Sequence, residues 1–285
     1  MKKHLKMTAL FFMLCAATAS AQYDVPYVPT DYAVVDTMLS VAGVNKSDTL
    51  YDLGCGDGRI VVAAAKIGVA KAIGIDINPV RIQESKANAE KAGVTNKVEF
   101  READIFKSDY KDATVITMYL LYTVDLRLRP TFFQVLKPGT RLVSHDFNMG
   151  DWTADRVITV LGSDGWGNHT VYYWVIPANA SGDWTFTAGN LPHALHIDQK
   201  YQKVSGTIEV NGTKSEITDM AITGAALQFS VKASDGTVYR YNGTVNGNAI
   251  TGTIVSGQTS TKWEAARDPK TTQVIVSQDA SGELE

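Results

Sequence analysis

The chain has 285 residues, of which 45% are hydrophobic and 20% charged, a composition typical of a globular protein with one or two domains. Its 27 basic and 30 acidic residues give a formal net charge of −3. Beyond the first few residues there is no basic run and no interleaving of aromatic with basic side chains. This pattern argues against nucleic acid as a partner.

The first 21 residues differ in character from the rest of the chain. Lysines near the N-terminus form a basic start, an apolar run follows, and Ala19-Ser20-Ala21 is a small-x-small cleavage site. The pattern predicts a secretory signal peptide over residues 1–21 and an exported protein, periplasmic or extracellular. The apolar run is too short to span a bilayer, so we expect no transmembrane anchor after cleavage. An uncleaved anchor is the alternative.

Strand and helix patterns alternate over residues 22–177, the first predicted domain. Thr30-Asp31 cap a helix that Gly43 ends, and an irregular stretch precedes a last strand at 171–176. The alternation predicts βαβ units and a mainly parallel sheet. Between these ends we expect strands at 49–53, 72–75, 98–100, 114–121 and 141–145, and helices at 60–65, 79–92 and 127–136.

The loop after the first of these strands is rich in glycine. It reads Tyr51-Asp52-Leu53-Gly54-Cys55-Gly56-Asp57-Gly58-Arg59. Arg59 stands where a dinucleotide fingerprint requires glycine, and the Gly-Lys-Ser/Thr of a phosphate loop is absent. The remaining pattern, acid-x-G-x-G-x-G, resembles motif I of class I S-adenosylmethionine-dependent methyltransferases. A plain strand-to-helix turn is the alternative, and Cys55 is interpreted as a small side chain that fills this turn.

Two further strands end at acidic residues. Asp76 lies 18 residues after Gly58, where an acid in an open α/β sheet binds ribose hydroxyls. Asp104 follows the third strand. In the family that the loop resembles, an acid at this place holds the exocyclic amine of adenine.

Three residues are candidates for catalysis. Tyr119 lies at the end of the fourth strand, in an apolar sequence that suits an aliphatic amine, although it equally suits a plain pocket wall. His145 and Asp146 end the fifth strand and are candidates to deprotonate an ammonium group or to position a substrate; a structural role is the alternative. The pair His193 and His196 has an odd spacing that points the rings to opposite faces of a strand, so we expect no metal.

Residues 178–268 contain no helical period. Short alternating runs are separated by turn dipeptides, which predict a small all-β antiparallel domain, a β-meander forming a sandwich or small barrel. The polar residues 269–285 are expected to form a flexible tail. The turn dipeptides are Asn211-Gly212, Asp235-Gly236, Asn242-Gly243 and Asn246-Gly247.

Residues 25–177 resemble exported bacterial class I methyltransferases related to the mitochondrial lysine methyltransferases that modify the ATP synthase c-subunit. The resemblance implies a Rossmann-like, seven-stranded methyltransferase sheet with its last strand antiparallel, S-adenosylmethionine in the crevice, and Tyr27 and Thr30 in a cofactor lid. The enzyme relatives work where the cofactor is made and lack the β-domain. The matching stretches are 25–30, 52–61, 136–139 and 144–147.

These features predict an exported methyltransferase that moves a methyl group to an amine, with protein lysine as the leading substrate. Asp76 is expected to hold the ribose and Asp104 the adenine, while the β-domain recruits substrate. The alternative is a binding protein that keeps the pocket without turnover and engages a cell-envelope component through its β-domain. Gly54, Gly56 and Gly58 are expected to pass the methionine part of the cofactor. Asp52 and Asp57 of the same loop are further candidates for cofactor binding.

Overall fold

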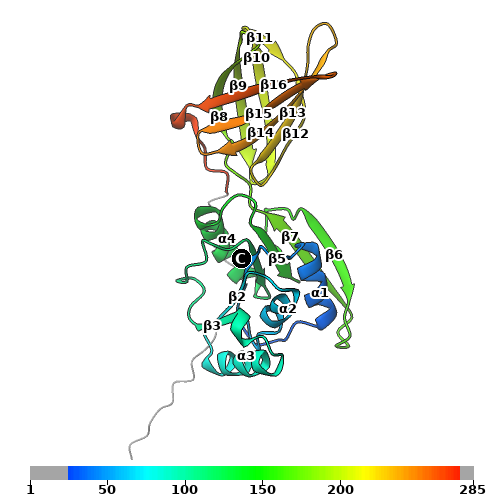
Figure 1. The fold of residues 1–285 in the computed structure, drawn as a ribbon, viewed down its shortest axis with the longest axis vertical. Helices are drawn as coiled ribbons and strands as arrows, with labels where there is room; N and C mark the ends of the chain where they lie inside the picture. The colour runs from blue at the N-terminus through cyan, green and yellow to red at the C-terminus, as the bar shows by residue number, and fades with distance from the viewer. Residues whose placement is uncertain (1–24, 277–285) are drawn as a thin grey trace, which may run out of the picture.

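The computed structural model describes residues 25–276, which form two β-sheets one after the other along the chain (Figure 1). The first sheet has seven strands and is flanked by helices, and the second has nine antiparallel strands. The change from one to the other falls between Val175 and Gly182. The predicted signal peptide lies outside the described residues, as do residues 277–285. We call the two parts the α/β part and the β part.

The seven-stranded sheet has the order β3-β2-β1-β4-β5-β7-β6. Strands β1 to β5 are parallel and β7 is antiparallel to both of its neighbours, which confirms the predicted methyltransferase sheet. Strand β6 falls in the stretch that was expected to be irregular. The bounds are β1 Thr49–Leu53, β2 Lys71–Asp76, β3 Val98–Glu102, β4 Val115–Met118, β5 Arg141–His145, β6 Arg156–Leu161 and β7 Asn168–Val175.

Helices cover both faces of this sheet. Asp31 accepts the Ala33 N–H at 2.8 Å and so caps the first helix, as predicted. The fourth helix begins at Tyr122, earlier than the predicted residue 127. The prediction extended the preceding strand to residue 121, because the apolar run continues beyond the end of β4. The bounds are α1 Tyr32–Val41, α2 Arg59–Ile67, α3 Pro79–Lys91 and α4 Tyr122–Val135, with a short 3₁₀ turn η1 at Thr95–Lys97.

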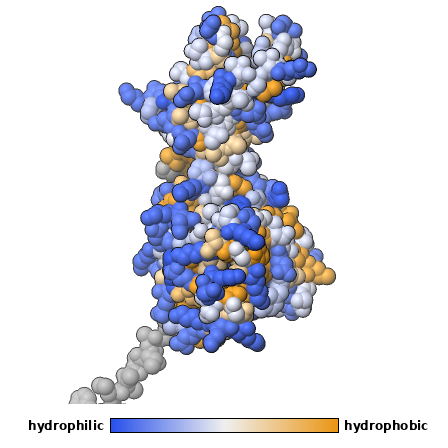
Figure 2. All heavy atoms as spheres, viewed as in Figure 1, coloured by the Kyte–Doolittle hydropathy of each residue, from blue (hydrophilic) through white to orange (hydrophobic). Residues whose placement is uncertain are grey.

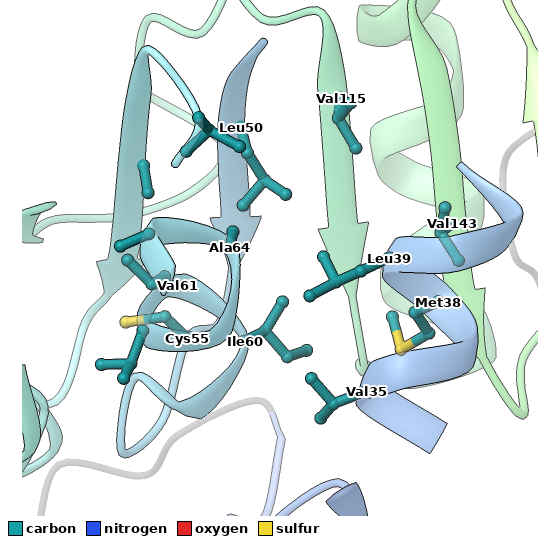
Figure 3. Close-up of a cluster of buried hydrophobic side chains, with 14 of the residues drawn as sticks. Val35, Met38, Leu39, Leu50, Cys55, Ile60, Val61, Ala64, Val115 and Val143 are labelled. Atoms are coloured by element: carbon teal, nitrogen blue, oxygen red, sulfur yellow. The ribbon is translucent and has the colours of Figure 1, made fainter. Parts of the chain in front are cut away.

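Alternate residues of the strands bury their side chains in two hydrophobic layers. Leu50 and Val115 point to the layer of α1, α2 and α3, whereas Tyr51 and Ile116 point to the layer of α4. Figure 3 shows the first layer, where side chains of α1 and α2 meet those of the strands. The labelled residues there are Val35, Met38, Leu39, Leu50, Cys55, Ile60, Val61, Ala64, Val115 and Val143.

The β part is a barrel-like sheet with the order β11-β10-β9-β8-β16-β15-β14-β13-β12. Asn211 and Gly212 form a predicted hairpin turn with φ values of 49° and 75°. The turn predicted at Asn242-Gly243 is wrong, because both residues lie inside β14, where a Cβ on Gly243 would stand 2.9 Å from Trp263. The bounds are β8 Gly182–Ala188, β9 Leu191–Lys200, β10 Lys203–Val210, β11 Thr213–Ser215, β12 Ile217–Thr223, β13 Ala226–Lys232, β14 Val238–Asn246, β15 Ala249–Ser256 and β16 Thr259–Arg267.

The first residues of the predicted tail are packed rather than free. After the short turn η2, Pro269–Thr271, the carbonyl of Gln273 accepts a hydrogen bond from Asn179 Nδ2 at 2.8 Å. Ile275 is buried, and its carbonyl accepts the Tyr201 N–H at 2.8 Å. The expectation of a flexible tail from residue 269 is therefore wrong for residues 269–276, since their backbone is hydrogen-bonded and Ile275 and Val276 pack against the rest of the chain.

The surface of the α/β part is mostly hydrophilic in the view of Figure 2. Apolar side chains gather at its right margin, where Figure 1 draws the edge strand β6, and Val157 and Leu161 of this strand are exposed. Within residues 25–276, none of the helices has the length and apolar character needed to cross a bilayer.

Candidate active site

A cavity of about 450 Å³ opens where β1, β2, β3 and β4 end. Its volume lies in the range of small-molecule sites, roughly 300–1,000 Å³. Strand β1 lies between β2 and β4, so the cavity sits at the point where the strand order reverses, which is where open α/β sheets bind ligands. The predicted residues that line it are Tyr27, Thr30, Asp52, Gly54, Gly56, Asp57, Asp76, Asp104 and Tyr119.

The glycine loop forms one wall of the cavity. Gly54 and Gly56 have φ values of 74° and 53°, which favour glycine. The Gly54 N–H donates to the Ile75 carbonyl at 2.8 Å, and the Gly56 N–H donates to Asp76 Oδ2 at 2.9 Å. A Cβ on Gly56 would stand 2.7 Å from Tyr27 Cε2. Glycine is therefore required here by the backbone and by the closeness of Tyr27.

Gly58 does not line the cavity, so the contact predicted between it and a cofactor is not found. Its φ is 77°, and it stands as the N-cap residue of α2. A Cβ at this position would meet Ser85 Cβ at 2.6 Å and Phe100 Cε1 at 2.8 Å. The third glycine of the loop thus allows α2 to pack closely against α3 and β3.

Four carboxylates line the cavity, and one of them, Asp57, is paired with Arg59. Asp52 is buried, and this burial raises its pKa to about 7 although Thr117 Oγ1 donates to it at 2.7 Å. Burial also raises the pKa of Asp76, whose oxygens accept two backbone N–H groups. The Phe106 N–H, helped by Lys107, lowers the pKa of Asp104. Carboxylates of this kind suit a ligand with hydroxyl, amine or cationic groups.

The N-terminal segment, residues 25–30, covers the cavity. Two arginines hold it, and the sequence analysis had not singled out either of them as a site residue. Arg81 stacks over the ring of Tyr27, with 4.3 Å between the guanidinium carbon and the ring centroid. Arg59 donates to the Thr30 carbonyl at 2.7 Å and pairs with Asp57 at 2.7 Å. From the sequence, Arg59 was used only to exclude a dinucleotide-binding fingerprint, because it stands where that motif requires glycine.

The structure separates the three residues predicted to be catalytic. Tyr119 lines the cavity, and its ring lies 3.8 Å from that of His145. His145 is fully buried behind Tyr119, and burial lowers its pKa to about 4. Asp146 adopts a φ of 60° and turns its carboxylate to the Thr170 N–H at 2.7 Å. Direct contact of His145 and Asp146 with a substrate is therefore not supported, because neither lines the cavity.

The pair His193 and His196 behaves as its spacing predicts. His193 is buried on one face of β9, where its ring stacks on Phe186. His196 lies on the other face, and its ring pairs with Asp183. The two imidazoles do not converge on a common point.

Comparison with known proteins identifies the family. Residues 52–156 match the ANTKMT methyltransferase domain. A protein-lysine N-methyltransferase of Saccharolobus islandicus is 50% identical over 153 residues, which are 53% of this chain and 94% of that protein. The adenine nucleotide translocase lysine N-methyltransferase of Mus musculus is 28% identical, over 58% of this chain and 69% of that protein.

A solved structure is also similar. An RNA methyltransferase from Salinibacter ruber in complex with S-adenosyl-L-homocysteine is 48% identical, covers 52% of this chain and 93% of that one, and superposes with a TM-score of 0.49.

The chain belongs to the S-adenosylmethionine-dependent methyltransferases, in the family of the ANTKMT methyltransferase domain. It is an enzyme of this class, and S-adenosylmethionine is its cofactor. The residues that line the cavity suit the chemical groups of S-adenosylmethionine. The cavity offers carboxylates for hydroxyl and amine groups, and apolar side chains such as Ile77 and Ile105 for a flat ring.

Proposed function

We propose that this chain transfers methyl groups to lysine side chains of a protein. The observation that carries the substrate class is the relative from Saccharolobus islandicus, which is named for this activity and is 50% identical over 94% of its length. The cavity supports methyl transfer because its lining joins the glycine loop, the acids after β2 and β3, and an apolar mouth after β4.

In this proposal each residue at the strand ends binds a different part of the cofactor. The loop at Gly54 and Gly56 receives the methionine part, because these two residues line the cavity and carry no side chain of their own that would keep a ligand from the backbone. Asp76 accepts hydrogen bonds from the ribose hydroxyls, and Asp104 accepts one from the adenine amine. Asp52 places a carboxylate in the cavity, where it favours a cationic ligand.

The mouth of the cavity positions the amine. When bound, S-adenosylmethionine supplies an electrophilic methyl group on a positively charged sulfur. Tyr119, Leu120 and Val124 wall the cavity after β4 and restrict water, which favours an uncharged amine over an ammonium group. Among the described residues the lining holds carboxylates but no histidine, and we propose that the lysine enters the cavity already uncharged. Alignment and exclusion of water then supply most of the rate enhancement.

We also propose that the protein acts outside the cytoplasm and that its β part recruits the substrate. The basic start, short apolar run and small-x-small site of residues 1–21 support export. The β part supports a recruiting role because it adds a second surface directly beside the α/β part. Trp152 Nε1 donates to Gln202 Oε1 at 2.9 Å, and the Ala178 N–H donates to the Gly224 carbonyl at 2.8 Å.

The test incubates the full chain with methyl-labelled S-adenosylmethionine and a cell-envelope extract. We expect label that protease releases and nuclease does not, and mass spectrometry should place it on lysine. The Asp76→Ala variant loses a cavity acid and should transfer far less, with its fold checked by circular dichroism. Label on nucleic acid would contradict the lysine assignment. Tight cofactor binding without any product would favour the alternative of a binding protein that engages the envelope.

A further inference from the structure

A cluster outside the cofactor cavity brings together two histidines and an aspartate. His145 is the last residue of β5, Asp146 follows it, and His169 lies near the start of β7. His145 Nε2 is 2.9 Å from His169 Nδ1. Asp146 Oδ2 is 3.2 Å from the first of these nitrogens and 3.3 Å from the second. Three atoms that are common metal ligands thus form a nearly equilateral triangle.

This triangle has the dimensions of one face of a tetrahedral zinc site. Zinc binds imidazole nitrogen at about 2.0–2.1 Å and carboxylate oxygen at about 2.0–2.2 Å, which separates neighbouring ligand atoms by about 3.3 Å. The observed separations of 2.9, 3.2 and 3.3 Å need only a small expansion to meet that value. Two imidazoles and a carboxylate are also a donor set that zinc accepts.

Hydrogen bonding alone does not satisfy all three sides of the triangle. If both ring nitrogens donate to Asp146, they face each other as two donors at 2.9 Å. If one ring donates to the other, the accepting nitrogen carries no proton, so its contact with the Asp146 oxygen is not a hydrogen bond. A cation at the centre removes the conflict, because all three atoms then act as electron-pair donors.

The surroundings of the three residues support metal binding as well. The outward nitrogen of His169, Nε2, lies 3.2 Å from Asp164 Oδ2. That of His145, Nδ1, lies 3.3 Å from Thr30 Oγ1. Metal-binding histidines usually donate their second N–H in this way, which fixes the ring and the tautomer. Asp146 Oδ1 accepts the Thr170 N–H at 2.7 Å, so Oδ2 is left for a metal.

The backbone and the burial of the cluster agree with a built site. Asp146 adopts a φ of 60°, a conformation that is uncommon for residues other than glycine and is concentrated at functional sites. The side chains of His145 and His169 are 1% and 6% exposed, whereas that of Asp146 is 32% exposed. Asp146 is thus the most exposed of the three residues.

We propose that His145, Asp146 and His169 bind one zinc ion, which joins the end of β5 to β7. The expectation of no metal rested on His193 and His196, and the sequence offered no reason to pair His145 with a residue 24 positions away. The site is structural rather than catalytic, because none of its three ligands lines the cavity. It is connected to the cavity through Tyr119, which stacks on His145, and through Thr30, so zinc should also tighten cofactor binding.

The test uses the full chain, stripped of metal by a chelator. Calorimetric titration with zinc should give one site per chain, and cobalt in its place should show the strong visible absorption of tetrahedral coordination. Zinc should raise the midpoint of thermal unfolding, because a ligand that binds only the folded state stabilises it. A chain that binds no zinc in a saturable way, or a cobalt spectrum of octahedral type, would overturn the proposal and leave the cluster a hydrogen-bonded contact.

Matched variants locate the site. His169→Gln and Asp146→Asn should each abolish stoichiometric binding; asparagine tolerates the backbone conformation of Asp146, so the second variant guards against misfolding of the first. Asp164→Asn should weaken zinc about 10- to 100-fold. The control His196→Gln, in the exposed pair with Asp183, should bind zinc as the parent chain does. Unchanged zinc affinity in both ligand variants, with the cofactor still bound, would place the metal elsewhere and refute the assignment.

Discussion

Parallel strands β1, β2, β3 and β4 of the α/β part all end at one edge of their sheet, and the loops that follow them form the walls of a cavity. The antiparallel strands of the β part instead return on themselves in hairpins. Their inward side chains fill the centre with aromatic rings, such as Phe229 stacked on Tyr241 with 4.6 Å between centroids. In the parallel sheet, the loops after the strands place polar residues around one ligand site. In the antiparallel sheet, the inward side chains pack against one another instead.

The largest effect that tests this difference is on stability. Trp263→Ala removes a buried ring of the β part that packs on Phe186 with 4.8 Å between centroids. The loss of this packing should lower the free energy of unfolding by about 3–5 kcal/mol, measured by denaturant titration followed by circular dichroism. Affinity for S-adenosylmethionine should stay within about twofold, because the cavity lies in the other part. A tenfold weaker affinity would show that the two parts depend on each other.

The matched change in the α/β part is Phe132→Ala. Phe132 is fully buried in the layer of α4, together with Met118 and Leu120 next to the cavity. This variant should lose comparable stability, about 3–5 kcal/mol, and cofactor affinity as well.

The next effect concerns the cavity alone. Asp76→Ala removes the carboxylate proposed for the ribose hydroxyls and also the acceptor of the Gly56 N–H. Hydrogen bonds to charged groups contribute roughly 1.5–3 kcal/mol each, so calorimetry should show at least about a 100-fold loss of affinity for S-adenosylmethionine. Asp235→Ala, in an exposed turn of the β part, is the control and should bind normally. Unchanged binding in Asp76→Ala would remove the ribose assignment.

The same substitution in both parts compares them directly. Gly56→Ala and Gly236→Ala both replace glycines with positive φ, 53° and 86°, so each should cost about 1–3 kcal/mol of stability through backbone strain. Only at Gly56 does the added Cβ meet a neighbour, Tyr27, whereas Gly236 faces open space. Cofactor affinity should therefore fall about tenfold or more in Gly56→Ala alone, and equal losses in both variants would contradict the role of the loop.

The smallest effect is a pH dependence. The pKa of Asp52 is about 7 in the free protein, and a nearby sulfonium favours its ionised form. Below pH 7 the carboxyl group must release a proton before a cation binds well, so affinity should fall by up to about tenfold per pH unit as pH decreases and level off above pH 7. The buried titratable Tyr241 of the β part has a pKa of about 12 and does not contribute in this range.

Two controls isolate this effect. S-adenosylhomocysteine has a neutral sulfur and should show a much weaker pH dependence in calorimetry. Asp52→Asn should remove the difference between the two ligands. A steep profile that persists in Asp52→Asn would assign the titration to another group.

The sequence predicted well those features that neighbouring residues determine. The glycine loop, Asp76 and Asp104 each lie at or just beyond the end of a strand, so their place at the sheet edge follows from the alternation of strands and helices. The antiparallel β7 was expected from the family resemblance. The start of α4 at Tyr122 was missed because an apolar run does not show where a strand ends and a helix begins.

Features that depend on distant residues could not be read in this way. Arg81 is one of several charged residues of a helix, and only the folded chain brings it over Tyr27. Thr30 and His145 are 115 positions apart yet lie within 3.3 Å of each other. The place of His145 behind Tyr119, rather than in the cavity, depends on the turn at Asp146, whose positive φ no local pattern indicates.

A crystal structure of the full chain with S-adenosylhomocysteine would test the central claim most directly. We predict ribose hydroxyls within hydrogen-bonding distance of Asp76, the adenine amine beside Asp104, and the sulfur facing Tyr119. A ligand bound at another place, or Asp76 directed away from the nucleoside, would contradict the account.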